Sequence, residues 1–545
     1  MGWRRNASAL RPPLGFVTRV AVWPVHRLYP QLRMPTVRPE SETSADISAD
    51  LDSLLRDVYG FDAFRPGQRE SIESAVAGRD TLVVMPTGSG KSLCFQMAGM
   101  VRGRATGGVT LIVSPLIALA DDQAEHLRRI GRGVAVINSS RTKKEIERAR
   151  EAIHDHEVQF VITTPERLQS SDLCDVLAEA GVALMVIDEA HCVCHWGHDF
   201  RPDYLALPYV RGRLDWPVMM AVTATAGSRT ADAIRRDLRM GDANVVRQSI
   251  HRPNLTLSVR RTDSPQERMA LLREELSRDV TDGDGRTIDG VTIVYCATTR
   301  TVDQLAKTFG GLAYHGKMRK KDRQRSFDSF LNDARPVMFA TNAFGLGIDK
   351  ADVRQVIHAE LPGSIEAYYQ EVGRAGRDGR PAACTLLYDP SDADLQKMFA
   401  GGGVDGAELA TAHRAVCLTR DAGDFDTDAG PDVMKVKDIV RHAPMGKGKM
   451  KTCLRWLSTR QIVVPAGRNR WRLIDDEPST STLETIAGTV ESMAEQRRWA
   501  LREMIDYAET GGCRWSDLAV HFGEKIDADR CECDNCGSVE VRRAA

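Results

Sequence analysis

A glycine-rich segment that joins an apolar run to an amphipathic stretch constrains this chain of 545 residues more than any other feature. Residues 85–92 read MPTGSGKS, follow the apolar run 82–84, and open a helical pattern at Lys91. Glycines let backbone amides close around a phosphate, and a helix N-terminus attracts its negative charge. The segment therefore predicts a phosphate-binding loop, although Met85 stands where the general pattern has glycine. A chance glycine-rich turn is the alternative.

The residue types in this loop indicate separate roles. Lys91 would reach the terminal phosphates of ATP, and Ser92 would hold a magnesium ion. ATP and Mg²⁺ are therefore the expected cofactors. Further contacts to the nucleotide are expected from Thr87, Gly88, Ser89 and Gly90.

An acidic pair follows the strongest apolar run of the chain. Asp188 and Glu189 come directly after residues 184–187, where a parallel sheet presents its catalytic groups. Asp188 would complete the magnesium site, and Glu189 would orient or deprotonate the attacking water. The alternative is a solvated acidic loop.

Two arginines in the second half of the chain are candidates for the same reaction. Residues 370–377 read QEVGRAGR. We expect Arg374 and Arg377 to begin a helix, to share one face of it, and to reach a phosphate across a cleft between domains. Such an arginine can raise the rate by roughly 10³–10⁵-fold. Gln370 is placed in the same catalytic group, and a surface charge cluster is the alternative.

The alternation of short apolar runs with longer amphipathic stretches indicates two α/β domains in tandem. Continuous apolar runs are typical of parallel strands buried on both faces, and 545 residues are too many for one core. A charged break from 260 to 286 separates the two sets of runs. The runs are 82–84, 111–113, 161–162, 184–187 and 218–222, then 293–295, 337–339, 356–357 and 385–387.

Together these motifs resemble superfamily 2 helicases, and further stretches resemble the RecQ family of DNA helicases. Residues 59–68 (YGFDAFRPGQ) are similar to that family's adenine-recognition motif, which implies that Gln68 and Arg65 read the base while Phe61 stacks on it. The resemblance also implies nucleotide contacts from Gly347 and Asp349. It extends in family order from about 51 to 389 through SPLIAL (114–119), TPERL (164–168), TATA (223–226), RPNL (252–255), YHG (314–316) and AFGLGIDK (343–350).

Residues 192–202 (CVCHWGHDFRP) resemble the family's aromatic-rich loop, which senses single-stranded DNA. Trp196 and Phe200 offer faces for stacking, at about 1–3 kcal/mol per base, and Arg201 offers a phosphate contact. His198 is included among the expected DNA contacts, and the family usually has glutamine at His195. Two alternatives stay open, which are plain core packing and a metal site formed by Cys192, Cys194, His195 and His198.

Four cysteines near the end of the chain have the composition of a structural Zn²⁺ site. Their surroundings resemble the family's zinc-binding module, but the Cys531-x-Cys533 step is one residue tighter than usual. Unliganded thiols or a redox pair are the alternatives. The expected ligands are Cys513, Cys531, Cys533 and Cys536.

A winged-helix-like unit precedes these cysteines, whereas the usual family order places the zinc module first. Lys447, Lys449 and Lys451 are its expected DNA contacts, with a solvated surface as the alternative. The formal net charge of the chain is −1, which does not exclude such local basic patches. We expect no membrane span, because no apolar run approaches roughly 20 residues.

The expected fold class is α/β: two RecA-like domains with parallel sheets, then a winged-helix-like unit and a small helical zinc-binding module. The expected boundaries are 1–48 for a disordered extension, 49–247 and 248–395 for the RecA-like domains, 396–432 for a linker with a short helix, 433–476 for the winged-helix-like unit, and 477–545 for the zinc module. The arginine-rich start could instead be a transit segment, or precede a true start at Met34.

The expected function is ATP hydrolysis coupled to translocation on single-stranded DNA and to duplex unwinding, in DNA repair or recombination. The resemblance implies 3′–5′ polarity. Single-stranded and partly duplex DNA are the expected partners of a monomeric, cytoplasmic, nucleoid-associated protein. A translocase without unwinding, an RNA helicase and a non-catalytic DNA-binding protein are the alternatives.

Overall fold

The computed structural model describes residues 44–537, except 116, 169–170, 195–200, 283, 334, 346–349, 401–403, 427–431, 468 and 527–530. The expected disordered extension 1–48 therefore lies almost wholly outside the described residues, and α1 begins at Ser44. No helix among the described residues is long and apolar enough to cross a membrane.

The first sheet has seven strands in the order β3-β4-β2-β5-β6-β1-β7, and all its pairs are parallel. Alternate residues enter two different cores: Leu82 and Val84 belong to one core, and Val83 to the other. Both faces are thus buried, which explains the continuous apolar runs. The strands are β1 Thr81–Val84, β2 Val109–Val113, β3 Val134–Ile137, β4 Phe160–Thr163, β5 Val182–Ile187, β6 Val218–Thr223 and β7 Asn244–Arg247.

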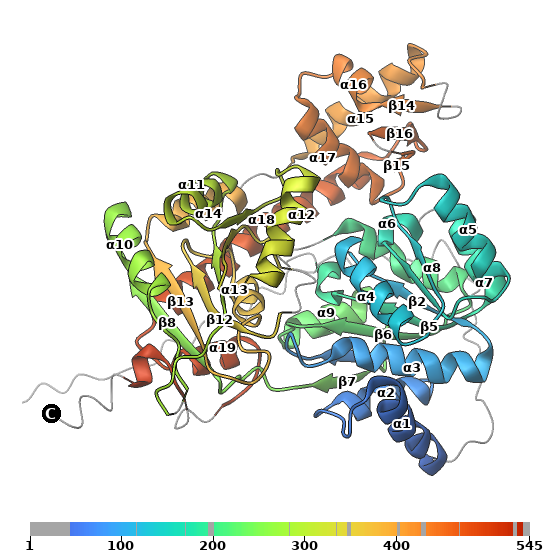
Figure 1. Ribbon diagram of the computed structural model, residues 1–545. Coiled ribbons are helices and arrows are strands. Elements are labelled where there is room, and N and C mark those ends of the chain that lie inside the picture. Colours follow the sequence, from blue (N-terminus) through green and yellow to red (C-terminus); the bar gives the residue numbers. More distant parts are fainter. Residues whose placement is uncertain are drawn as a thin grey trace, which may run out of the picture. The chain divides into compact units, whose positions relative to one another are not determined.

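Helices cover both faces of this sheet (Figure 1). α3 begins at Lys91, as the sequence predicted, and a short 3-10 helix, Ala190–Val193, follows the acidic pair. The helices are α1 Ser44–Tyr59, α2 Gln68–Val76, α3 Lys91–Thr106, α4 Ile117–Arg129, α5 Lys143–His154, α6 Pro165–Leu168, α7 Ser171–Ala180, α8 Leu207–Arg213 and α9 Ser228–Asp237, with a second 3-10 helix, Pro202–Ala206.

The second sheet has six parallel strands in the order β10-β11-β9-β12-β13-β8. These strands and their helices form the second RecA-like domain. The strands are β8 Leu255–Arg261, β9 Val291–Tyr295, β10 Leu312–Tyr314, β11 Val337–Ala340, β12 Val353–His358 and β13 Ala382–Tyr388; the helices are α10 Pro265–Leu276, α11 Thr299–Phe309, α12 Lys320–Asn332, α13 Ile365–Val372 and α14 Asp392–Ala400.

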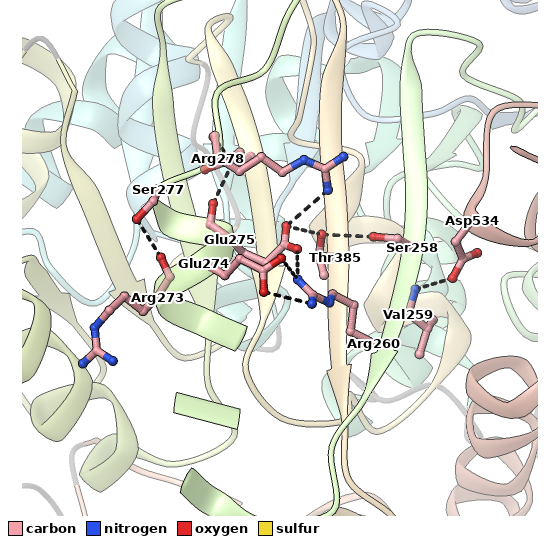
Figure 2. Close-up of polar contacts among 11 residues, drawn as sticks. Ser258, Val259, Arg260, Arg273, Glu274, Glu275, Ser277, Arg278, Thr385 and Asp534 are labelled. Carbon is pink, nitrogen blue, oxygen red and sulfur yellow. Dashed lines mark hydrogen bonds and ion pairs between the residues drawn. The ribbon is translucent and has the colours of Figure 1, made fainter. Parts of the chain in front are cut away.

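The charged segment from 260 to 286, which separates the two sets of apolar runs, lies inside the second domain. Its first residues end strand β8, and α10 follows. Glu275 of α10 is 2% exposed and accepts hydrogen bonds from Arg260 Nη1 (2.8 Å) and Thr385 Oγ1 (3.2 Å), as Figure 2 shows. Because this carboxylate joins α10 to two neighbouring strands, the charges belong to the interior of the second domain.

A small antiparallel sheet, in the order β14-β16-β15, follows in the chain. It has a core of its own with the helices around it, which agrees with the expected winged-helix-like unit. The elements are α15 Gly406–Asp421, β14 Val433–Lys435, α16 Val436–Ile439, a 3-10 helix Val440–His442, α17 Lys447–Ser458, β15 Val463–Pro465 and β16 Arg470–Leu473.

Helix α18, Thr480–Glu509, has 30 residues and is about 45 Å long. Ile486 and Val490 in its first half are buried in the core of the small sheet. Leu501 and Met504 in its second half are buried in the core of the second RecA-like domain. One helix therefore connects the winged-helix-like unit to the motor domain.

The cysteine-containing end of the chain packs on the edge strand β8 of the second sheet. After α19, Arg514–His521, Cys533 forms a parallel bridge with Leu257. Asp534 accepts a hydrogen bond from the Val259 backbone nitrogen at 2.8 Å (Figure 2). Asp534 also pairs with Arg514. The module thereby covers an edge that would otherwise expose unpaired backbone groups.

Candidate active site

The glycine-rich loop lies between β1 and α3, at the carboxyl edge of the first sheet. Gly88 and Gly90 have φ values of +82° and +86°, a conformation that residues with side chains rarely adopt. A β-carbon on Gly90 would lie 2.4 Å from Gln68 Nε2, so a side chain there would strain the backbone and also displace Gln68 from the loop. Lys91 Nζ donates to the carbonyls of Met85 (3.0 Å) and Pro86 (3.2 Å). The lysine is thus held at the loop from which it would reach a phosphate.

The start of α2 and the residues just before it are joined to the same loop. Gln68 Nε2 donates to the carbonyl of Ser89 at 3.0 Å, and Arg65 Nη1 donates to that of Gly88 at 2.6 Å. Phe61 is 53% exposed, so its ring is available for a ligand to stack on. Two of the three expected adenine contacts, Arg65 and Gln68, therefore lie beside the loop.

The acidic pair follows β5; Asp188 is buried, and the side chain of Glu189 is 13% exposed. Burial, and then repulsion from Glu189, raises the pKa of Asp188 to about 7. Burial alone would also raise the pKa of Glu189, but the hydrogen bond and charge of His191 and the charge of Lys91 leave it lowered. Burial lowers the pKa of Lys91, which the two carboxylates oppose. The site therefore brings two acids and one amine together in a partly enclosed environment, in which their electrostatic interactions are stronger than in water.

A polar connection runs from Glu189 to the second domain. His191 Nδ1 lies 3.3 Å from Glu189 Oε2 and 3.0 Å from Thr223 Oγ1. The Thr223 hydroxyl donates to the Thr225 carbonyl at 3.1 Å, and Gln370 Nε2 donates to the Thr225 hydroxyl at 3.3 Å. These contacts link the expected base to the helix that precedes the arginines.

Sequence reasoning gave no role to His191, Thr223 or Gln123, which donates to Asp188 Oδ2 at 3.2 Å. Thr223 begins the TATA motif, and His191 lies two residues after the acidic pair, so these positions were the available signal. Gln123 of α4 has no such signal, because its contact depends on two strands being neighbours in the sheet.

The two arginines do not begin a helix, which corrects the expectation. Helix α13 ends at Val372, and Gly376 has a φ of +55°, so Arg374 and Arg377 lie in the turn after the helix. The Arg374 guanidinium donates to the carbonyl of Gly345 in its own domain. Arg377 faces the phosphate loop: a β-carbon on Gly88 would lie 3.2 Å from its Cγ. Of the two, Arg377 is the one placed beside the loop.

Part of the expected DNA contacts falls outside the described residues. These are Trp196, His198 and Phe200, and the expected nucleotide contacts Gly347 and Asp349 also lie there. Arg201 is described, and its Nη1 donates to the Pro115 carbonyl at 2.7 Å. Just after the loop, the buried Tyr204 hydroxyl donates to the carbonyl of Asp188 at 3.0 Å. The segment that follows the loop is thus hydrogen-bonded to the acidic pair.

The three lysines of the winged-helix-like unit differ in their surroundings. Lys447 is exposed in the first turn of α17, and Lys451 is half-buried. Lys449 Nζ lies 2.8 Å from Glu408 Oε2 of α15. The positive end of the helix dipole repels lysine side chains near a helix N-terminus, so these lysines do not stabilise the helix. Their position favours the binding of an external anion.

The four expected zinc ligands converge. The sulfur atoms of Cys513, Cys531, Cys533 and Cys536 all lie within 4.8 Å of one another. A tetrahedral Zn²⁺ with Zn–S bonds of about 2.3 Å separates its sulfurs by about 3.8 Å, so the residues fit the ion. The short Cys531-x-Cys533 spacing therefore does not keep either thiol out of the cluster.

Family comparisons agree with this arrangement of domains. The DEAD/DEAH box helicase model matches residues 65–234, the helicase conserved C-terminal domain model matches 268–379, and the RecQ zinc-binding model matches 471–537. Two solved structures share the fold: a DUF1998 helicase MrfA bound to DNA (17% identity, TM-score 0.51, covering 79% of this chain and 63% of that one) and Dbp5 of S. cerevisiae bound to RNA (17%, 0.50, 65% and 92%). These features define a two-domain helicase motor.

Similarity to two named DNA helicases narrows the class of protein from two-domain helicase motors to one family. A probable ATP-dependent DNA helicase RecS of Bacillus subtilis is 38% identical over 356 residues, which cover 64% of this chain and 69% of RecS. The ATP-dependent DNA helicase RecQ of Haemophilus influenzae is 37% identical over 64% of this chain and 55% of that protein, so the match spans little more than half of its length. The chain belongs to the RecQ family of ATP-dependent DNA helicases.

Proposed function

We propose that the protein hydrolyses Mg²⁺-ATP and uses the energy to translocate in the 3′–5′ direction on single-stranded DNA and to unwind duplexes in repair or recombination. The observation that carries the proposal is the meeting of Lys91, Asp188 and Glu189 at one edge of the first sheet, with Arg377 of the other domain facing the loop. Hydrolysis then depends on both domains, which is the condition for a motor.

In this proposal the protein's own groups act as follows. Lys91 and the amides of residues 87–92 bind the phosphates, while Ser92 and Asp188 would hold Mg²⁺, which neutralises charge on the β- and γ-phosphates. Glu189 accepts a proton from the attacking water, and Arg377 stabilises the transition state. Gln370 and Arg374 position the turn that carries Arg377 through their bonds to Thr225 and Gly345. Phe61, Arg65 and Gln68 contact the adenine, and Gly347 and Asp349 complete the nucleotide site.

The DNA contacts are also proposed. Trp196 and Phe200 would stack on bases, and His198 and Arg201 would contact the strand. Lys447 and Lys451 would contact phosphates of duplex DNA. Lys449 would contact a phosphate after its ion pair with Glu408 breaks. We further propose a monomer that works on the nucleoid in the cytoplasm.

ATP turnover with different nucleic acids tests the substrate. Single-stranded DNA is expected to stimulate hydrolysis, whereas RNA of equal length stimulates it weakly. Trp196→Ala is expected to lose the stimulation with little change in KM for ATP, because the expected nucleotide contacts lie elsewhere, whereas Tyr204, just after the loop, contacts the acidic pair. Stronger stimulation by RNA would refute the DNA assignment, and full stimulation of the variant would refute the sensing role.

A further inference from the structure

The segment that joins the two RecA-like domains runs from the end of β7 at Arg247 to the start of β8 at Leu255. Its first residue, Gln248, is held by the first domain. The Gln248 backbone nitrogen donates to the carbonyl of Val84 at 3.0 Å, and its side chain donates to the carbonyl of Pro66. Any rotation of one domain against the other therefore has to occur after Gln248.

The next two residues are bound on the other side of this point. Ile250 is buried in the core of the second domain, and its carbonyl accepts a hydrogen bond from the Tyr369 hydroxyl at 2.7 Å. The Ile250 backbone nitrogen donates to both carboxylate oxygens of Glu524 in the zinc module, at 3.3 and 3.2 Å. The Ser249 hydroxyl donates to the same carboxylate at 3.0 Å. Both backbone polar groups of Ile250 are thus bound, and the zinc module supplies one of the two partners.

The end of α19 directs Glu524 toward this segment. Gly523 has a φ of +78°, and its nitrogen donates to the Val520 carbonyl at 3.1 Å. The Glu524 nitrogen donates to the Ala519 carbonyl at 2.7 Å. This pair of hydrogen bonds is the Schellman ending of a helix, which requires the left-handed conformation that glycine adopts readily. The helix end therefore fixes the direction in which the Glu524 side chain leaves the module.

The rest of the joining segment holds the turn that carries Arg377. Arg252 Nη2 donates to the carbonyls of Ala375 at 3.1 Å and Gly376 at 2.6 Å. Asn254 Nδ2 also donates to the Gly376 carbonyl, at 2.8 Å. Because these bonds join the segment to the turn, a displacement of the segment would also displace the arginine.

A second residue of the zinc module contacts the same segment. The indole of Trp515 is fully buried, and its Nε1 donates to the Leu255 carbonyl at 3.3 Å. The Trp515 ring also packs edge-on against that of His251, with 5.1 Å between the ring centroids. These contacts do not involve Glu524, so the module should stay in place when the carboxylate is removed.

We propose that Glu524 is a positioning residue for ATP hydrolysis, which confines the rotation between the two RecA-like domains to the junction of Gln248 and Ser249. The inference rests on the proposed function, because it takes hydrolysis to require Arg377 at the phosphate loop. A hinge at one junction gives the domains a defined path of closure, whereas a longer flexible segment lets Arg377 arrive in many orientations. A misplacement of about 1 Å can lower the rate by on the order of a hundredfold, so a defined path favours turnover.

Steady-state ATP hydrolysis at saturating single-stranded DNA tests this role. For Glu524→Ala we expect kcat to fall about five- to twentyfold, because the hinge loses its restraint. The KM for ATP should change by less than about twofold, because Lys91 and Gln68 keep their contacts with the phosphate loop. Glu524→Gln keeps an oxygen acceptor for the Ile250 amide and should retain most of the activity.

The same substitution in an Arg377→Ala background shows whether Glu524 acts through the arginine. Without the guanidinium there is no group to position, so Glu524→Ala should lower kcat by less than about a further twofold. A role in folding alone would instead multiply the two losses. Hydrogen exchange measures the hinge directly: the amides of residues 249–251 should exchange faster in Glu524→Ala, and those of residues 85–92 should not.

Glu532→Ala is the matched control, because Glu532 is an exposed acid of the same module. Its contact with the Leu257 backbone nitrogen is made by its own backbone carbonyl, which the substitution keeps. This variant should hydrolyse ATP as the unmodified protein does. Elemental analysis of every variant should find the same zinc content as in the unmodified protein.

Four results would overturn the inference. They are an unchanged kcat for Glu524→Ala, losses that multiply in the double variant with Arg377→Ala, an equal loss of kcat in Glu532→Ala, and loss of zinc from Glu524→Ala, which would place the effect in the folding of the module. The proposed function fails in a different way. If the unmodified protein hydrolyses no ATP with any nucleic acid while residues 249–251 are protected from exchange, the proposed function is refuted and this role with it.

Discussion

His521 Nε2 of α19 lies 3.0 Å from Glu366 Oε1 in the first turn of α13. Its other ring nitrogen lies 3.5 Å from Glu503 of α18. On the same side, the Phe522 ring packs 5.1 Å from that of Tyr369. The zinc module therefore holds the helix that leads to Arg374 and Arg377.

This contact predicts a pH-dependent stability. Burial would lower the pKa of His521, but hydrogen bonds to Glu366 and Glu503 raise it to about 9. Because the folded pKa is raised, the contribution is complete below about pH 6.5 and is lost as the pH rises through about 9. His521→Gln should therefore cost on the order of 3 kcal/mol near pH 6 and little above pH 9.

Calorimetric unfolding of both proteins at several pH values measures this difference. His154→Gln, which removes an exposed histidine 3.8 Å from Glu179, should have almost no effect at any pH. A destabilisation by His521→Gln that is the same near pH 6 and near pH 9.5 would show that packing, not charge, holds the contact.

Because the carboxylate of Glu275 in α10 is buried, we expect substitutions of two adjacent residues to differ in their effect on the free energy of unfolding. Glu275 is 2% exposed, whereas the side chain of Glu274 is 62% exposed, and both pair with Arg260. Glu275→Ala should cost about 2–3 kcal/mol, less than a fully buried pair because the Arg260 side chain is 31% exposed. Glu274→Ala should cost under about 1 kcal/mol. Equal effects in urea unfolding would contradict the buried network.

The ATP site predicts loss of catalysis without unfolding. Lys91→Ala and Glu189→Gln should each lower DNA-stimulated hydrolysis by about a hundredfold or more, because the first loses phosphate charge and the second loses the base. Glu151→Gln, on the exposed face of α5, should retain full turnover. Substantial hydrolysis by either site variant, purified to homogeneity, would refute the assignment.

The cysteine cluster predicts one Zn²⁺ per chain. Cys533→Ser should lose the metal and loosen the module from β8, since Cys533 both belongs to the cluster and bridges Leu257. Cys417→Ser, outside the cluster, should keep it. Elemental analysis and hydrogen exchange of residues 255–261 measure the two effects. Retention of a full equivalent of zinc by Cys533→Ser would exclude that ligand.

The sequence predicted the strands that form the longest apolar runs, but it missed β3, although residues of β3 enter both cores of the first domain. β5 and β6 are long apolar runs, and both were predicted. β8 was missed because its end carries two charged residues, Arg260 and Arg261. In the fold, acidic neighbours pair with both arginines, and Arg261 is also exposed to solvent. β10 was missed because it has three half-buried residues and lies at an edge.

The same distinction holds for the candidate site: residues that follow apolar runs were predicted, and contacts that depend on the fold were not. The spacing of Lys91, Asp188 and Glu189 from apolar runs predicted their meeting, because the carboxyl ends of parallel strands share one edge. The contact of Gln123 with Asp188 could not be predicted, since it depends on which strands are neighbours in space. The position of Arg374 and Arg377 was misjudged because the glycines of that segment end the helix instead of beginning one.

Strand displacement on short duplexes with a 3′ or a 5′ single-stranded tail tests the central claim most directly. With ATP and Mg²⁺, the protein should separate the 3′-tailed duplex, leave the 5′-tailed one paired, and do neither as Glu189→Gln. The account would be contradicted if the 3′-tailed duplex stays paired while DNA-stimulated hydrolysis proceeds, because the protein would then be a translocase that does not unwind.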